Sequence, residues 1–389
     1  MSESSNDVFM PLKIGIMTLL QSDNYGAVLQ AYALQLFLRE EGHNPFFINF
    51  LGDSPSLAKF MLHPWASIQK FRNLGWTSFI PKRPSASSAS HLQSVMSHFR
   101  AEHLNIKGEF FGYDELVQSP PEADAYVCGS DCVWAYDAFF SSPAYLLGFA
   151  PDNALRVAYA PSFGKGRLER YQWAPFRRYL DRFDAMSARE SSGVKLLSDL
   201  GIQDVARVLD PTFLPSHYRD VYKVHEEVHG PYLLAYILNQ ERSLTQNAID
   251  TIISVARRRE LKIVWIATDY LPSDIQDFEV KQPCPGDFLR LIECASLIVT
   301  NSFHGCVFSV RYRRDFICLA RDRFEDKKNL RMLELLKLVG LRDRFLWPHE
   351  NAKLPIRDLV PICHENVQKR LQPHVERSKQ YLRAALRVS

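Results

Sequence analysis

The sequence lacks the short motifs that mark many nucleotide-binding and hydrolytic enzymes. Its 389 residues contain no Walker A sequence, no GxGxxG fingerprint and no GxSxG nucleophile elbow. Its seven cysteines are scattered, and Cys128 and Cys132 are too far apart to form a CxxC redox or zinc pair. His, Cys and carboxylate residues do not cluster at ligand spacings, so we expect no metal site. These absences argue against a P-loop enzyme, an α/β-hydrolase and a metalloenzyme.

The sequence also lacks a strong charge excess and a long apolar run. A formal net charge of +3 is small for this length, and no nucleic-acid-binding motif is present, so we expect no nucleic-acid partner. Without a run of about 18 or more apolar residues, we expect no membrane-spanning helix. Residues 1–7 carry acids and no Lys or Arg, which is not typical of a signal peptide. We expect a cytoplasmic protein, and leave open that it works at the inner face of the membrane.

What the chain does contain is enough apolar residues for packed cores. Hydrophobic residues make up 46% of the sequence and aromatic residues 12%, and the length favours two domains. Residues 13–18 and 45–50 read as strands, and between them apolar residues recur from Gly26 onward at helical spacing. This strand–helix–strand unit is the usual start of a parallel sheet, so the pattern predicts an α/β fold.

The chain divides into two predicted domains, residues 1–215 and 216–389. The second begins a new α/β unit at residues 232–237 (YLLAYI), after a proline-containing linker. Within the first, residues 53–93 read as an irregular insertion rich in Pro and Ser. The basic segment 369–387 predicts a terminal helix. We favour packing of this helix on the domain over attraction to an anionic membrane surface, so membrane contact is at most peripheral.

Polar or small residues follow the predicted strands, where open α/β sheets bind their ligands. The candidate binding residues at these strand ends are Asn24, Tyr25, Gly26, Ser130, Asp131, Ser162, Glu190, Ser302, Phe303 and Gly305. Structural roles compete with each of them. Gly26 suits a tight turn, Asp131 suits a helix cap, and Glu190 suits a surface ion pair with Arg189.

Two further strand-end residues are candidate catalytic groups. His304 follows the apolar run 295–299 and begins a predicted helix, where backbone N–H groups favour an anion and an imidazole can move a proton near neutral pH. Arg189 lies at a similar point after the run 185–187, and a cation there calls for a nearby anion or acid. For His304 the competing interpretation is a buried histidine at a helix start.

Six sequence blocks stand out along the chain: NYGAVLQAYALQ (24–35), YVCGSDCVW (126–134), YAPSFG (159–164), SAREssG (187–193), VLDPTFL (208–214) and TNSFHG (300–305). They occur in the order and spacing that is typical of the polysaccharide pyruvyl transferase family. The chain therefore resembles this family over about residues 13–320.

The resemblance implies two Rossmann-like domains facing a cleft, similar to the GT-B glycosyltransferase fold. It implies transfer of a pyruvyl group from phosphoenolpyruvate, as co-substrate and without a cofactor, to sugar hydroxyls of a bacterial-type polysaccharide or its precursor, forming a ketal. His304 matches a family histidine implicated in donor binding and acid catalysis, and Arg189 matches an arginine implicated in holding phosphoenolpyruvate. The family pattern commonly has Gln at the position of Cys132 and a small residue at the position of Pro161. These two departures concern the identity of the acceptor more than the reaction class.

Two other functions stay open at this point. The same architecture serves a GT-B glycosyltransferase with a nucleotide-sugar donor, and a carbohydrate-binding protein without activity is the other alternative. Having both Arg189 and His304 argues against the second. The acceptor is expected to be a saccharide, and a lipid-linked oligosaccharide, a nucleotide sugar and a glycan terminus are all compatible with the sequence.

Overall fold

The computed structural model describes residues 10–52, 91–135, 143–164, 168, 170–222, 228–238, 242–268, 278–321, 327–347 and 360–387. Most of the segment expected to be an irregular insertion, residues 53–93, lies outside these ranges. Its last three residues belong to a helix that starts at His91.

Seven parallel strands form the first sheet within the described residues, in the order β3-β2-β1-β4-β5-β6-β7. The strands are β1 (Lys13–Met17), β2 (Asn44–Phe50), β3 (Ile106–Phe110), β4 (Ala125–Cys128), β5 (Leu155–Ala158), β6 (Ala185–Ala188) and β7 (Ala206–Arg207). The order of the first six is that of a Rossmann sheet, which reverses between β1 and β4.

The second sheet repeats this topology with six parallel strands among the described residues, in the order β10-β9-β8-β11-β12-β13. Its strands are β8 (Tyr232–Tyr236), β9 (Lys262–Ile266), β10 (Glu279–Lys281), β11 (Leu297–Thr300), β12 (Phe316–Leu319) and β13 (Phe345–Leu346). The central strands β8, β11 and β12 are buried along their whole length, as a sheet covered on both faces requires. The prediction of an α/β protein with two Rossmann-like domains is therefore confirmed.

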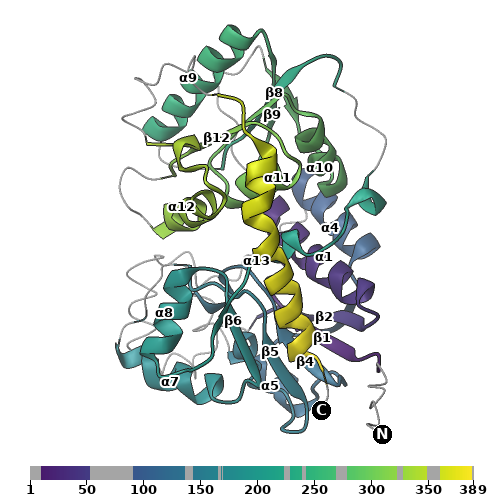
Figure 1. The fold of residues 1–389 in the computed structure, drawn as a ribbon. Coiled ribbons are helices and arrows are strands. Elements are labelled where there is room, and N and C mark those ends of the chain that lie inside the picture. Colours follow the sequence, from purple (N-terminus) through teal and green to yellow (C-terminus); the bar gives the residue numbers. More distant parts are fainter. Residues whose placement is uncertain are drawn as a thin grey trace, which may run out of the picture.

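Helices connect the strands and cover the sheets (Figure 1). They are α1 (Tyr25–Glu40), α4 (His91–His103), α5 (Tyr113–Gln118), α7 (Arg170–Leu180), α8 (Ser191–Asp199), α9 (Arg242–Arg259), α10 (Pro285–Cys294), α11 (Phe303–Arg311), α12 (Lys327–Val339) and α13 (His364–Ala385). The sheets occupy residues 13–207 and 232–346, so the expected domain division near residue 215 falls between them.

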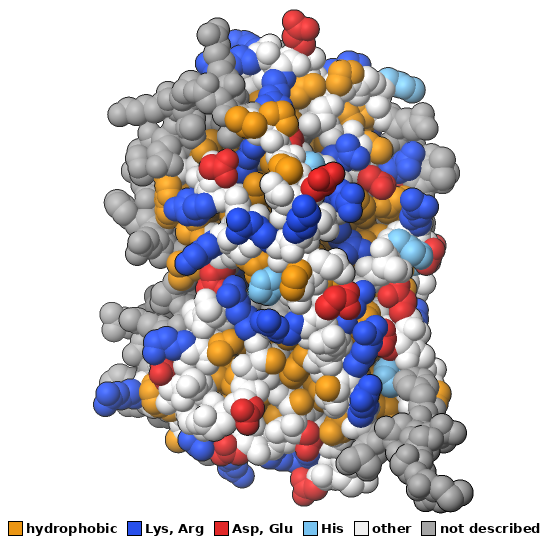
Figure 2. Space-filling model, viewed as in Figure 1, with side chains coloured by type: hydrophobic (Ala, Val, Ile, Leu, Met, Phe, Trp, Pro, Cys, Tyr) orange, Lys and Arg blue, Asp and Glu red, His pale blue; other side chains and the backbone are white. Residues whose placement is uncertain are grey.

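The C-terminal helix α13 runs along both domains (Figure 1). It buries an apolar side that includes Leu371 and Leu382, and the hydroxyl of Tyr381 donates to the Ala158 carbonyl in the first sheet, 2.9 Å away. Arg383 pairs with Glu41 at the end of α1, at 2.6 Å. Lys and Arg side chains gather across the middle of this face, over α13 and the junction of the domains (Figure 2). Helix α13 therefore ties the end of the chain back to the first domain.

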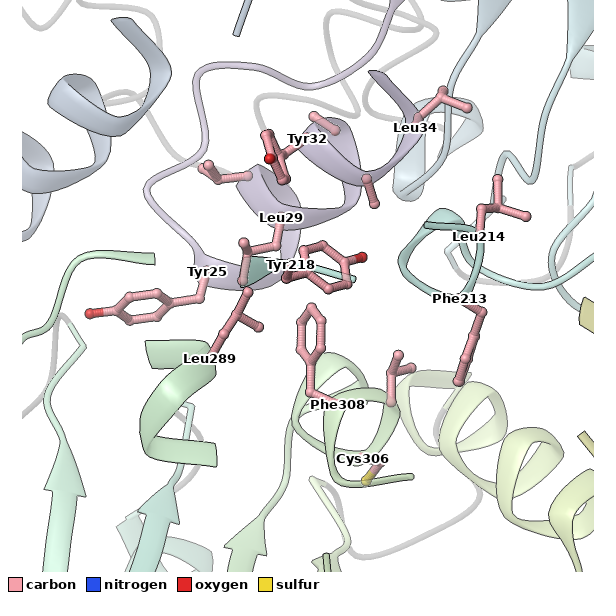
Figure 3. Close-up of a cluster of buried hydrophobic side chains, with 14 of the residues drawn as sticks. Tyr25, Leu29, Tyr32, Leu34, Phe213, Leu214, Tyr218, Leu289, Cys306 and Phe308 are labelled. Atoms are coloured by element: carbon pink, nitrogen blue, oxygen red, sulfur yellow. The ribbon is translucent and has the colours of Figure 1, made fainter. Parts of the chain in front are cut away.

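The two domains share one hydrophobic core at their junction (Figure 3). Leu29 of α1, Tyr218 of the linker and Phe308 of α11 belong to this continuous cluster. The ring of Tyr25 stacks on Phe288 of α10 with centroids 4.4 Å apart, and the Tyr25 hydroxyl donates to a backbone carbonyl of the second domain. Because separating the domains would expose this apolar surface to water, burial fixes how their strand ends face each other.

Candidate functional site

Arg189 lies at the end of β6, where the strand gives way to α8, and is only 7% exposed. Its Nη1 donates to Oδ2 of Asp210 at 2.8 Å. Glu190 and Asp131 supply two more carboxylates within ion-pair distance, at 3.6 and 3.8 Å. Burial by itself would lower the pKa of Arg189, but Asp210, Glu190 and Asp131 together raise it above the ordinary value. Arg189 is therefore a permanent cation in a buried, acid-rich setting.

Asp210 joins Arg189 to the second domain. It follows β7 at the start of the linker, and its carboxylate has no solvent exposure. Its Oδ2 lies 3.4 Å from Nε2 of His304, and its Oδ1 accepts from the backbone N–H and the hydroxyl of Thr212. Burial alone would raise the pKa of Asp210, but His304 and Arg189 outweigh it and hold the pKa well below the ordinary value. One ionised carboxylate thus anchors the two side chains that the sequence singles out.

His304 is placed by tight packing at the start of α11. Ser302 caps this helix by accepting from the Gly305 backbone N–H at 3.4 Å. A Cβ at position 26 would overlap the His304 ring, and a Cβ at position 305 would overlap the Thr300 side chain. Glycine at both positions therefore lets α1 and β11 approach the histidine, which is only 7% exposed.

The structure brings five other predicted residues to the same place. Ser130 and Asp131 follow β4, and Nη1 of Arg189 lies 3.5 Å from the Ser130 hydroxyl. Ser162 donates to Oε1 of Glu190 at 2.5 Å, while Oε2 of Glu190 has no hydrogen-bond partner among the described residues. Phe303 lies under the Arg189 guanidinium, 4.8 Å from the ring centroid.

The remaining predicted residues hold the helices and turns around the site in position. Asn24 caps α1 by accepting from the backbone N–H groups of Gly26 and Ala27. Tyr25 packs in the domain junction, as described above. Ser302 and Gly305 shape the turn into α11. In this structure, then, these residues and Gly26 hold the backbone and His304 in position, while Arg189, His304 and the five residues of the preceding paragraph make up the candidate site.

A cavity of about 120 Å³ opens beside Arg189, between the domains and against α13. Residues of the first domain, α11, α12 and α13 line it: Arg189, Glu190, Arg207, Val208, Leu209, Asp210, Phe213, Phe303, Arg331, Glu334, Leu335, Leu338, His374, Arg377 and Ser378. Two arginine N–H groups near it, Nε and Nη2 of Arg189, have no hydrogen-bond partner within the described chain. A small anion suits such a site, because buried cationic N–H groups need acceptors.

Two residues of this site were missed in the sequence. Asp210 stands in the VLDPTFL block after a strand, so its strand-end position was available as a signal. Arg331 lies in the middle of α12, where the local pattern shows only an amphipathic helix with scattered charges. No group of three or more His, Cys, Asp or Glu side chains in the described ranges is arranged to hold a metal ion. Nor, within those ranges, is any helix long and apolar enough to cross a membrane.

Two Rossmann-type sheets with a shared site at their strand ends define a GT-B-like protein. UGT89C1 of Arabidopsis thaliana in complex with UDP-L-rhamnose matches 97% of this chain and 98% of its own, with a TM-score of 0.53 and 11% identity. The same protein in complex with quercetin matches 96% of this chain and 99% of its own, with a TM-score of 0.50 and 10% identity. At such low identity these likenesses show the fold alone.

A comparison of the sequence with family models defines the class of protein more closely than the fold does. The family model described as polysaccharide pyruvyl transferase matches residues 24–323, and the chain belongs to this family. A comparison with curated proteins gives no match.

Proposed function

We propose that the protein transfers the pyruvyl group of phosphoenolpyruvate to two hydroxyls of a sugar, forming a ketal on a polysaccharide or its precursor. The observation that carries the proposal is the meeting of Arg189 and His304, from opposite domains, on Asp210 at the edge of a small cavity. Family membership supports the same reaction class.

Arg189 is suited to hold the donor. Its Nη1 donates to Asp210, whereas Nε and Nη2 lie 3.6 and 3.8 Å from carboxylate oxygens of Glu190 and Asp131 without a hydrogen bond to them, and the donor carboxylate would take the place of these two longer contacts. The Nε and Nη2 groups lie on one edge of the guanidinium, the geometry that binds a planar carboxylate through two parallel hydrogen bonds. Phe303 lies against the guanidinium and restricts its rotation.

His304 is suited to supply a proton. Protonating the methylene carbon of the enol makes the neighbouring carbon electrophilic, with oxocarbenium character. A sugar hydroxyl attacks that carbon, the bond to the phosphate oxygen breaks and inorganic phosphate leaves. A second hydroxyl then attacks the same carbon and closes the ketal. Each hydroxyl loses one proton: one replaces the proton that was added to the methylene carbon, and the other leaves with phosphate. Asp210 keeps the imidazole oriented and stabilises its protonated form when it acts as general acid.

Glu190 is the better placed of the two candidate bases for the sugar hydroxyl. It lines the cavity, and its Oε1 is held by Ser162 while its Oε2 accepts no hydrogen bond from the described residues. The carboxylate of Asp131 is nearer to solvent. The proposed reaction uses no cofactor beyond the donor, and its acceptor is a saccharide, with a lipid-linked one among the choices. Since phosphoenolpyruvate is a central metabolite, we propose that the enzyme works in the cytoplasm.

The test is which donor the protein consumes. Purified protein is incubated with a saccharide acceptor and either phosphoenolpyruvate or a nucleotide sugar, and released inorganic phosphate and nucleoside diphosphate are measured. Phosphate release that depends on acceptor supports pyruvyl transfer, whereas nucleoside diphosphate release supports the glycosyltransferase alternative. In a thermal-shift assay, a ligand at 100 times its dissociation constant adds about 2.7 kcal/mol of stability. No shift with millimolar phosphoenolpyruvate would count against the proposal.

A further inference from the structure

The surroundings of Arg189 are too acidic for it to bind a multiply charged anion alone. Asp131, Glu190 and Asp210 place three formal negative charges within ion-pair distance of this single guanidinium. Even with His304 protonated, the group stays formally negative. A donor that carries both a carboxylate and a phosphate adds further negative charge, so at least one more cation must face the cavity.

Arg331 and Arg377 both line the cavity, and Arg331 is the one whose guanidinium faces the same Phe303 ring as Arg189. It comes from α12 in the second domain and lines the same cavity as Arg189. Its guanidinium lies 5.8 Å from the centroid of the Phe303 ring, which also contacts the Arg189 guanidinium, so one aromatic ring positions both arginines. No carboxylate of the described chain forms an ion pair with Arg331, and its buried Nε has no hydrogen-bond partner there. By contrast, Arg207 in the same cavity is paired with Glu334 at 3.0 Å.

Cys132 explains why the charge of Arg331 stays available. Nη1 of Arg331 lies 3.4 Å from the Cys132 sulfur. Burial raises the pKa of the Cys132 thiol, so the sulfur stays neutral and does not compensate the guanidinium. A neutral thiol is also a weak hydrogen-bond acceptor, which an incoming oxyanion displaces readily.

We infer that Arg331 binds the phosphate group of the donor while Arg189 binds its carboxylate. This inference rests on the proposed function and assigns the two ends of the donor to different domains. It also makes Cys132 a specificity position, because a charged residue there would lie beside Arg331 in the phosphate site.

The experiment measures dissociation constants by calorimetry for phosphoenolpyruvate, inorganic phosphate and pyruvate. Arg331→Gln is expected to weaken binding of phosphoenolpyruvate and inorganic phosphate at least about tenfold, because one charge-assisted hydrogen bond is lost. Pyruvate binding is expected to stay unchanged. Arg331→Lys keeps the charge and is expected to recover part of the loss. Lys337→Gln removes the same charge from an exposed position of α12 and is the matched control, expected to bind as the wild type does.

A second pair of variants tests the inference with Arg331 in place. Cys132→Asp puts a carboxylate beside Arg331 and is expected to weaken phosphate binding, whereas Cys132→Asn, of similar size but neutral, is expected to weaken it less. Circular dichroism shows whether Arg331→Gln folds. If it does not, the two Cys132 variants still test the inference.

Three results would overturn the inference: unchanged phosphate affinity in Arg331→Gln, an equal loss of pyruvate affinity, or no phosphate binding by the wild type. The proposed function fails separately, if the wild type binds phosphate through Arg331 but releases none from phosphoenolpyruvate. Turnover of phosphoenolpyruvate with normal phosphate affinity in Arg331→Gln would retain the function and reject the role of Arg331.

Discussion

Gly26→Ala tests whether the position of His304 controls turnover. The Cβ of alanine would approach Nδ1, Cγ and Cβ of His304 more closely than real Cβ atoms approach their neighbours. These atoms include the base of a short side chain, so the ring cannot simply swing away. The substitution therefore forces the imidazole, or α1 itself, to shift from the place where Asp210 holds it.

The expected size of the effect follows from two opposing contributions. Overpacking a well-packed site costs about 1–3 kcal/mol of unfolding free energy. Alanine is the better helix former by up to about 1 kcal/mol, so the net destabilisation is roughly 0–3 kcal/mol. A shift of about 1 Å in a catalytic group can lower turnover about a hundredfold, so activity is expected to fall much more than stability.

The same substitution in a His304→Ala background is the control. With the ring removed, the two closest overlaps, with Nδ1 and Cγ, are gone and only the Cβ of residue 304 stays close, at 2.8 Å, so Gly26→Ala should cost less stability than in the wild type and should not lower turnover further. The coupling free energy between the two positions should be about 1–3 kcal/mol in a double-mutant cycle measured by urea unfolding. Equal effects of Gly26→Ala in both backgrounds would refute the reasoning and assign Gly26 a role in α1 alone.

Three further predictions concern the residues that meet at Asp210. His304→Ala should keep the fold and lower phosphate release at least about a hundredfold, because the acid is lost; near-normal release would remove His304 from catalysis. Arg189→Lys should raise KM for phosphoenolpyruvate because an ammonium cannot form the two parallel hydrogen bonds, and an unchanged KM would make Arg189 structural. The lowered pKa of Asp210 stabilises the fold fully above the unfolded value of about 3.9, and this contribution is lost as pH falls toward the folded value. Asp210→Asn should therefore lose less stability than the wild type between about pH 5 and pH 3 in urea unfolding, and matching acid profiles would contradict this.

Much of the fold was predictable because its signals are local. Short apolar runs such as residues 125–128 and 297–300 gave buried parallel strands, and the helical spacing after Gly26 gave α1. Edge strands were harder. Strand β3 is largely exposed and β13 has only two residues, so neither has a strong apolar pattern, and both depend on a neighbouring strand that the local sequence does not reveal.

Part of the site was also predictable, because residues at the carboxyl ends of parallel strands share one edge of a sheet. That rule brought Arg189 and Glu190 forward as candidates in the first domain, and His304 in the second. It did not reveal that Asp210 would join Arg189 to His304, since a conventional interpretation of Asp-Pro-Thr after a strand is a turn or helix cap.

The two strand–helix repeats, the family and the residue types at the strand ends can all be inferred from the amino-acid sequence. Which of those strand ends meet depends on tertiary packing, because the shared core of α1, the linker, α10 and α11 sets the angle between the domains. Tertiary packing also decided that Arg331, an unremarkable charge on an amphipathic helix, faces the cavity without a carboxylate partner in the described chain. The local sequence around a charged residue does not show which carboxylates will lie beside it, because the packing of distant segments determines those neighbours.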